Sequence, residues 1–79
     1  MTLLWFDYGK LKKLRRQLGL KQSEAVVLFN QFSGSDISAA TLGNWENGRT
    51  NITVKDLMLL TRVYGVSDIS RFFYEKAGD

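Results

Sequence analysis

The chain of 79 residues contains no cysteine, no histidine and no proline. Without cysteine, a disulfide, a thiolate metal site and a cysteine nucleophile are all excluded. Without histidine, the chain lacks the side chain that most often serves as a general base or a metal ligand. We therefore expect no enzyme and no metal or other cofactor. The lack of proline favours helices joined by short turns.

Long apolar runs are missing too, and none approaches the roughly 20 residues that cross a membrane. The apolar start, residues 1–6, is too short and too uncharged for a signal peptide. Apolar residues make up 44% of the chain and charged residues 24%, which is an ordinary globular composition. We expect a cytoplasmic protein with a single domain over residues 1–79, because a chain of this length builds one core.

The positive charge is concentrated at one end of the chain. Residues 1–22 hold six basic side chains against one acidic one, a net charge of +5, whereas residues 23–79 hold five against seven, a net charge of −2. Such asymmetry indicates an anionic partner, nucleic acid first. The alternative is a solvated helix face that binds nothing.

Apolar residues recur at helical spacing in five segments separated by glycine and serine. The predicted helices cover residues 7–18, 22–32, 38–47, 53–64 and 67–75. Suitable N-cap residues are Asp7, Ser38, Thr53 and Ser67. No segment alternates apolar and polar residues as a strand does. The sequence therefore predicts an all-α domain of five short helices.

Each segment has a predicted apolar side. The inward residues are Leu4, Tyr8, Leu11, Leu14 or Arg15, and Leu18; Ala25, Val26, Phe29 and Phe32; Leu42 and Trp45; Val54, Leu57, Leu60, Thr61 and Tyr64; and Ile69, Phe72 and Phe73. Gly43 is an exception to good helix design, since a mid-helix glycine costs about 1 kcal/mol relative to alanine. It predicts that something lies close to the backbone there.

Three stretches, taken in order, resemble the helix-turn-helix domain of phage repressors and Cro proteins, the lambda repressor-like or XRE family. They are Arg15-x-x-Leu18-Gly19-Leu20-x-Gln22, Leu42-x-x-Trp45-Glu46-Asn47-Gly48-Arg49 and Tyr64-Gly65-Val66-Ser67. The resemblance covers residues 8–73. It implies a prokaryotic or phage-encoded transcriptional regulator, in which a homodimer binds double-stranded operator DNA. It favours a stand-alone switch protein over a full-length repressor.

The resemblance makes residues 38–47 the recognition helix, which enters the major groove. The residues that it places toward the bases are Ser38, Ala39, Ala40, Thr41 and Asn44, with Gly43 between them. Asn44 is the best candidate for reading sequence, because an asparagine amide matches the N6 and N7 atoms of adenine. Ala39 and Ala40 offer only apolar contact, for example to a thymine methyl group.

The same resemblance implies contacts with DNA phosphates from Lys21, Gln22, Asn47, Arg49 and Thr50. Gln22 opens a helix, whose N-terminus attracts phosphate; the alternative is an ordinary exposed residue. Asn47 has a plain helix-capping role as its alternative. Arg15 and Glu46 resemble the internal ion pair of the family, and a charge beside an apolar stripe needs such a partner.

The sequence departs from the family in two places, and the second departure favours another function. The stretch between Gln22 and Leu42 is longer than usual, which predicts a longer second helix and a longer turn through residues 33–37. The recognition helix has no Arg, Lys or Gln between Ser38 and Gly48. The alternative function is an antirepressor, modulator or antitoxin that binds a partner protein, such as a repressor, on the same fold.

Aromatic residues near both ends, Trp5-Phe6 and Phe72-Phe73-Tyr74, have two readings as well. They either complete the core or form the interface of a dimer.

Overall fold

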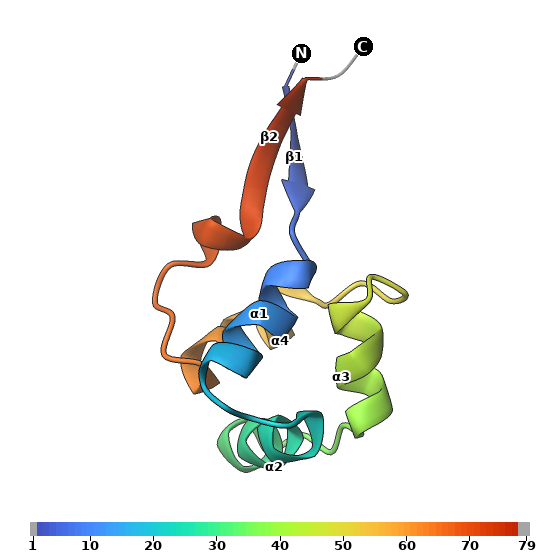
Figure 1. The fold of residues 1–79 in the computed structure, drawn as a ribbon, viewed down its shortest axis with the longest axis vertical. Coiled ribbons are helices and arrows are strands. Elements are labelled where there is room, and N and C mark those ends of the chain that lie inside the picture. Colours follow the sequence, from blue (N-terminus) through green and yellow to red (C-terminus); the bar gives the residue numbers. More distant parts are fainter. Residues whose placement is uncertain (1, 78–79) are drawn as a thin grey trace.

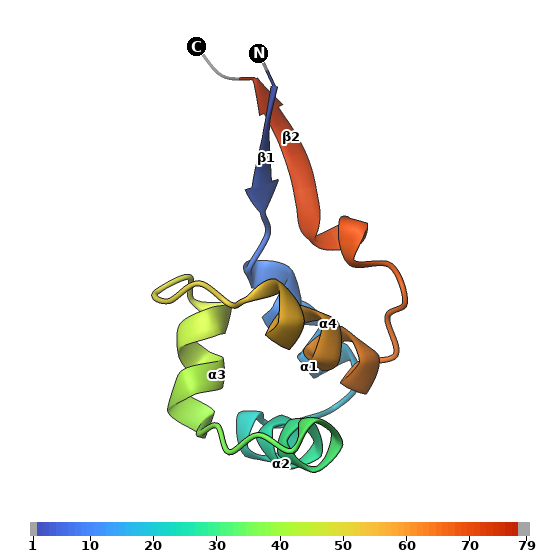
Figure 2. The same cartoon turned by 180° about the vertical axis from the view of Figure 1, so that it is seen from behind.

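The computed structural model describes the backbone of residues 2–77 and the side chains of residues 5–74. Helices form the body of the molecule, and the two ends of the chain pair as a narrow ribbon that projects from it (Figures 1 and 2). In chain order the elements are β1 (Thr2–Phe6), α1 (Gly9–Gln17), α2 (Gln22–Ser33), α3 (Ala39–Glu46), α4 (Val54–Val63), the 3-10 helix η1 (Ile69–Phe72) and β2 (Phe73–Ala77).

Two of the predicted N-caps are confirmed and two are wrong. The hydroxyl oxygen of Ser38 accepts a hydrogen bond from the backbone N–H of Thr41, and Thr53 caps α4 in the same way. Asp7 does not cap α1, because its own N–H donates to the carbonyl of Phe72 and its backbone belongs to the base of the ribbon. At η1 the cap is Asp68 and not Ser67.

The core fills the space between the four α-helices and η1. Its buried apolar residues are Leu11, Ala25, Val26, Phe29, Leu42, Trp45, Leu57, Leu60, Tyr64, Val66 and Phe72. The rings of Phe29 and Trp45 meet edge to face, with centroids 5.9 Å apart. Most predicted inward residues are therefore confirmed, and contact between α2 and both α3 and α4 holds the bundle together.

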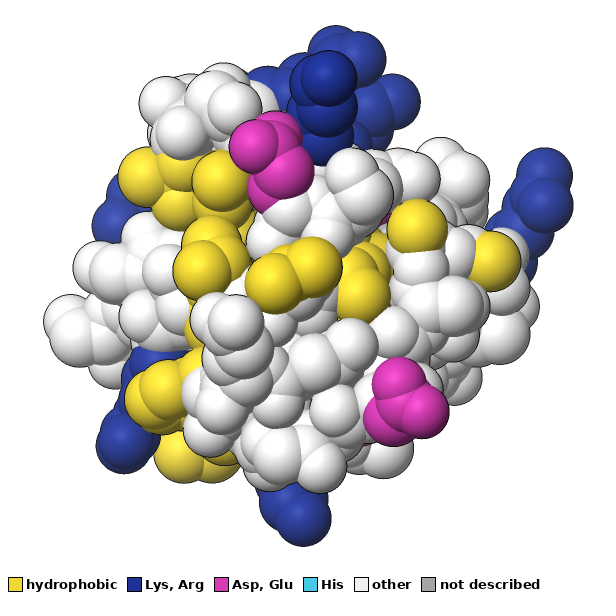
Figure 3. Space-filling model, turned by 90° about the horizontal axis from the view of Figure 1, so that it is seen from below, with side chains coloured by type: hydrophobic (Ala, Val, Ile, Leu, Met, Phe, Trp, Pro, Cys, Tyr) yellow, Lys and Arg dark blue, Asp and Glu magenta, His cyan; other side chains and the backbone are white. Residues whose placement is uncertain are grey.

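Five predicted inward residues are exposed. One of them, Phe73, lies in β2, and the other four lie at or just beyond the ends of α-helices: Tyr8, Leu18, Phe32 and Val54. Helical periodicity extends the apolar stripe to these helix ends, but the neighbouring elements do not cover the side chains there. On α2, Phe32 joins Val27 and Leu28, which are also exposed. The face of the molecule seen from below carries hydrophobic side chains across its middle and basic side chains at its rim (Figure 3).

The predicted fifth helix, residues 67–75, is wrong, and so is the expectation that the chain has no strand. Only Ile69–Phe72 is helical there, as one 3-10 turn, and Phe73–Ala77 forms β2. β2 pairs antiparallel with β1, Trp5 opposite Tyr74 and Phe6 opposite Phe73. The pairing partners stand at opposite ends of the chain, so no local pattern announces them. Leu4, predicted to face inward, lies in β1, outside the residues with described side chains.

The terminal aromatics divide between the two readings that the sequence left open. Phe72 is fully buried. The ring of Phe6 packs against the rings of Phe72 and Phe73, with centroids 6.2 and 5.6 Å apart. Trp5, Phe73 and Tyr74 keep exposed surface on the ribbon. Within residues 2–77, no helix combines the length and apolar character that crossing a bilayer requires.

Candidate nucleic-acid interface

Helix α3 has one buried side and one open side. Leu42, Trp45 and Glu46 face inward and are 1%, 6% and 3% exposed. On the other side Ser38 and Ala40 are exposed, and Thr41 and Asn44 are half-buried. Of the residues predicted to read bases, only Ala39 packs against the core, while still partly exposed. The predicted reading side of α3 is therefore open at Ser38 and Ala40 and partly covered at Thr41 and Asn44.

The hydroxyl groups on this side are already engaged. The oxygen of Ser38 accepts from the N–H of Thr41, and the two hydroxyl oxygens lie 3.2 Å apart. A capping hydroxyl has less freedom to follow a base edge, because turning it away would leave the Thr41 N–H without its acceptor. The Asn44 amide makes no hydrogen bond to another described side chain or to the described backbone. It is therefore freer than the two hydroxyl groups to contact a base.

The turn before α3 is held by Asn30, a residue that sequence reasoning missed. The Asn30 side chain donates to the carbonyl of Ile37 and accepts from the N–H of Ile37, each over 3.0 Å. The turn follows Gly34, whose positive φ ends α2. Helix α2 continues to Ser33, one residue beyond its predicted end, and α3 begins at Ala39 after its N-cap, Ser38. No sequence signal identifies Asn30, because its partner lies in an irregular segment.

A buried polar network fixes α3 against α1 and α2. The guanidinium of Arg15 donates through Nε to Glu46 Oε2 at 2.7 Å and through Nη2 to Oε1 at 3.0 Å. Its Nη1 donates to the carbonyl of Leu20. The ion pair that the resemblance implies is thus present, and it is almost fully buried. A bidentate pair of this kind orients both side chains.

Gln22 joins this network from the start of α2. Its Nε2 donates to Glu46 Oε1 at 3.1 Å, so the amide lies across α3. A β carbon at residue 43 would stand 3.4 Å from that nitrogen. Something therefore does lie close to the backbone there, but the distance is ordinary van der Waals contact and leaves room for an alanine. The bond to Glu46 leaves one N–H of the Gln22 amide for an outside acceptor such as phosphate.

The turn after α3 presents the other predicted phosphate contacts. The N–H groups of Gly48 and Arg49 donate back to the carbonyls of Trp45 and Asn44, and Gly48 has a φ of +72°. This is the Schellman arrangement, which fixes the direction of the chain as it leaves the helix. Asn47 is the C-cap and is exposed, and Arg49 and Thr50 beyond it are exposed as well.

Positive charge lies on two further elements. Lys21, exposed at the N-cap of α2, stands beside Glu24, whose carboxylate accepts from the Lys21 N–H. Along α1, Lys12, Lys13 and Arg16 line a shallow hollow together with Gly9 and Gln17. Lys10 is occupied differently, because its ammonium group donates to the carbonyl of Arg71. These cations form the pool from which phosphate neutralisation can be drawn.

The titratable groups near the core serve structure. The hydrogen bond from Arg15 to Glu46 raises the pKa of the Arg15 guanidinium. Burial raises the pKa of the Tyr64 phenol, whose hydroxyl has no hydrogen-bond partner among the described residues. Within that part of the chain, no three His, Cys, Asp or Glu side chains are grouped to hold a metal ion.

Comparison with protein-family models finds one whose description is helix-turn-helix domain, matching residues 9–71. No curated protein and no solved structure matches the chain. The matched range runs from the first residue of α1 into η1, and it contains the α2–turn–α3 unit described above. The chain belongs to the helix-turn-helix domain family, whose members bind DNA.

Proposed function

We propose that this protein is a sequence-specific transcriptional regulator of the phage repressor or Cro type, which reads operator DNA by placing α3 in the major groove. The observation that carries the proposal is the open side of α3. Ser38 and Ala40 are exposed and Asn44 is accessible, while the opposite side is anchored by Leu42, Trp45 and the buried Glu46. A helix held in this way can enter a groove without disturbing the core.

The proposal divides the contacts between two groups. Asn44 reads a base edge, with Thr41, Ser38, Ala39 and Ala40 lining the groove, and Asn47, Arg49, Thr50, Lys21 and Gln22 hold phosphates. Base contacts give sequence preference, whereas phosphate contacts fix the register and supply affinity for every sequence. With few long side chains on α3, the sequence-dependent shape of the DNA supplies part of the discrimination.

A homodimer on DNA is part of this proposal. One helix-turn-helix unit covers a half-site, and symmetric dimers read two half-sites about 34–36 Å apart. Phe73, with surface exposed on the ribbon, supports a contact between copies at that end of the molecule. Sedimentation with duplexes that carry one or two half-sites measures the stoichiometry; a single copy on the double site would contradict the dimer.

The experiment that tests the function is a gel shift. The purified protein is mixed at moderate salt with duplexes selected from a random pool, and with the DNA upstream of its own gene. A shift that survives competition by random DNA supports the proposal. A protein that shifts every duplex equally, or none, contradicts it.

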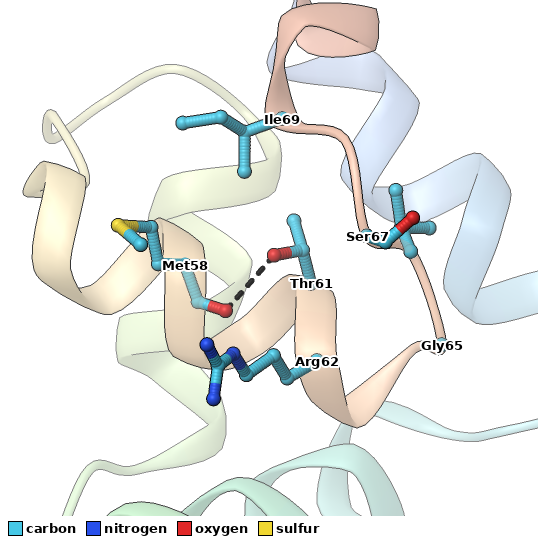
Figure 4. Close-up of a pocket in the computed structure, with 7 residues that line it drawn as sticks. Met58, Thr61, Arg62, Gly65, Ser67 and Ile69 are labelled. Carbon is cyan, nitrogen blue, oxygen red and sulfur yellow. Dashed lines mark hydrogen bonds between the residues drawn. The ribbon is translucent and has the colours of Figure 1, made fainter.

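Two apolar surfaces favour a second candidate, a modulator, antirepressor or antitoxin that binds a partner protein. One is the exposed side of α2, which carries Val27, Leu28 and Phe32. The other is a hollow of about 420 Å³ beside α4, where Met58 and Ile69 lie across from each other and Arg62 extends along the edge (Figure 4). A DNA shift that appears only after a partner repressor is added would favour this candidate over direct operator binding.

A further inference from the structure

Tyr8, which lies between β1 and α1, packs on the turn that follows the proposed recognition helix. A β carbon at Gly48 would stand 2.7 Å from Tyr8 Cε1 and 2.8 Å from Tyr8 Cζ. Such distances are far inside van der Waals contact, so the tyrosine ring already occupies the space beside the Gly48 backbone. Two features therefore favour glycine at residue 48. Its φ is positive, and the Tyr8 ring leaves no room for a side chain.

The geometry also places the hydroxyl of Tyr8. Cζ, the carbon that bears the hydroxyl, is among the ring atoms nearest to Gly48. The hydroxyl group therefore lies beside the turn that carries Asn47, Arg49 and Thr50, all of them exposed. Tyr8 itself is 47% exposed, and its hydroxyl makes no hydrogen bond to any described residue. It is a donor directed at solvent, next to the residues proposed to hold phosphate.

The backbone on both sides of the Tyr8 side chain is held in place. The N–H of Asp7 donates to the carbonyl of Phe72 at 2.6 Å, and the carbonyl of Tyr8 accepts from the N–H of Leu11. The ring of Phe6 packs against Phe72 at the base of the ribbon. In Figures 1 and 2 the start of α1 lies next to the loop after α3, with the ribbon above them. A contact made by a side chain held in this way loses little conformational freedom on binding.

We propose that Tyr8 is a further residue of the DNA-backbone contact. Its ring packs against the Gly48 turn. Its hydroxyl donates a hydrogen bond to the DNA phosphate that the residues of this turn contact. Tyrosine hydroxyls are among the usual donors to DNA phosphates. The inference rests on the proposed function, since it assigns a new residue to the same site. It also gives the terminal ribbon a role, which is to position Tyr8.

The test is the substitution Tyr8→Phe, which removes the hydroxyl and keeps the ring. Fluorescence anisotropy measures binding to a selected duplex and to a random duplex, over a series of salt concentrations. We expect roughly 10- to 100-fold weaker binding to both, the range of one hydrogen bond to a charged acceptor. The ratio of the two affinities and the salt slope stay as in the wild type, because the lost group is neutral and touches no base.

Two matched variants and the melting temperature separate contact from packing. Ser70→Ala removes an exposed hydroxyl from η1, which packs against α4 and β2, and leaves binding unchanged. Tyr8→Ala also removes the ring and binds more weakly than Tyr8→Phe. The melting temperature of Tyr8→Phe stays at the wild-type value.

Wild-type affinity in Tyr8→Phe would overturn the inference and leave the proposed function standing. So would a loss confined to the selected duplex, or a loss accompanied by an equal fall in stability. A wild-type protein that binds no duplex would overturn both the inference and the function.

Discussion

The amide nitrogen of Gln22 lies 3.4 Å from the point where a β carbon on Gly43 would stand, and it donates to Glu46 on the same helix. One side chain from α2 thus rests on α3 where α3 has no side chain of its own. Because that distance is ordinary van der Waals contact, an alanine methyl group at residue 43 would fit beside the Gln22 amide.

For Gly43→Ala we expect an unfolding free energy within about 1 kcal/mol of the wild type. The gain in helix propensity is about 1 kcal/mol, and the new methyl group makes an ordinary contact with the Gln22 amide. In a Gln22→Ala background that contact is absent, so the difference between the two backgrounds measures what the contact contributes. Urea unfolding of the four proteins measures this coupling. A coupling of zero would show that the two residues do not interact.

Removing either partner of the Arg15–Glu46 pair should be strongly destabilising. Arg15→Ala or Glu46→Ala leaves a buried charge without its partner, which costs about 3–5 kcal/mol. The double variant Arg15→Met with Glu46→Leu replaces both charges by apolar groups and should unfold at a higher urea concentration than either single variant. Equal or lower stability of the double variant would mean that the pair itself, and not the orphaned charge, dominates.

Asn44→Ala and Arg49→Ala should have different effects on DNA binding. Loss of the base-reading amide relaxes discrimination at one base position by about 1–3 kcal/mol. Loss of the Arg49 charge weakens selected and random duplexes alike. Arg62→Ala, which removes an exposed charge from α4, is the matched control and keeps wild-type affinity. Similar profiles for the Asn44 and Arg49 variants would contradict the division between base and phosphate contacts.

The affinity for DNA should fall steeply with salt. The cations from which each subunit can draw are Lys12, Lys13, Arg16, Lys21, Arg49 and Lys55, together with Lys10 if its ammonium group leaves the Arg71 carbonyl. If a dimer neutralises about ten phosphates, the logarithm of the binding constant falls with the logarithm of salt concentration with a slope near −9. Anisotropy titrations between low and moderate salt give this slope. A binding constant that does not respond to salt would contradict phosphate-based affinity.

Stability at alkaline pH should depend on Tyr64. Burial raises the pKa of this phenol in the folded protein above the usual tyrosine value of about 10. The folded state therefore disfavours ionisation. The contribution to stability is fully present below about pH 10 and is lost as the pH rises above that value, where the unfolded chain ionises. Tyr64→Phe should show a flatter decline in unfolding free energy than the wild type over that range; parallel declines would contradict it.

Local sequence patterns predict most of the helical body. Ser38 and Thr53 mark the starts of α3 and α4, because each side chain accepts a hydrogen bond from the backbone N–H three residues later. The spacing of Leu57 and Leu60 indicates the buried side of α4. The Arg15–Glu46 pair was accessible through the family resemblance, and the close approach at Gly43 through the cost of a mid-helix glycine. These signals are local or carried by motifs, so they can be read without coordinates.

The ribbon was not predictable in that way. Phe73 lies in a segment whose periodicity fits a short helix, and it becomes a strand because Phe6, at the other end of the chain, pairs with it. The contact of Asn30 with Ile37 and that of Tyr8 with Gly48 depend equally on how the helices pack. No residue type or spacing in the sequence marks any of these pairs.

By itself, the sequence determined the four helices, most of the core and the likeness to helix-turn-helix domains, because each depends on residues within a few positions of one another or on a recurrent motif. Only the tertiary structure decided the terminal ribbon, the aromatic surface left exposed on it and the tyrosine that supports the turn after α3. Strand pairing and side-chain contact join residues far apart in the chain, and their free energy exists only once the helices have brought those residues together.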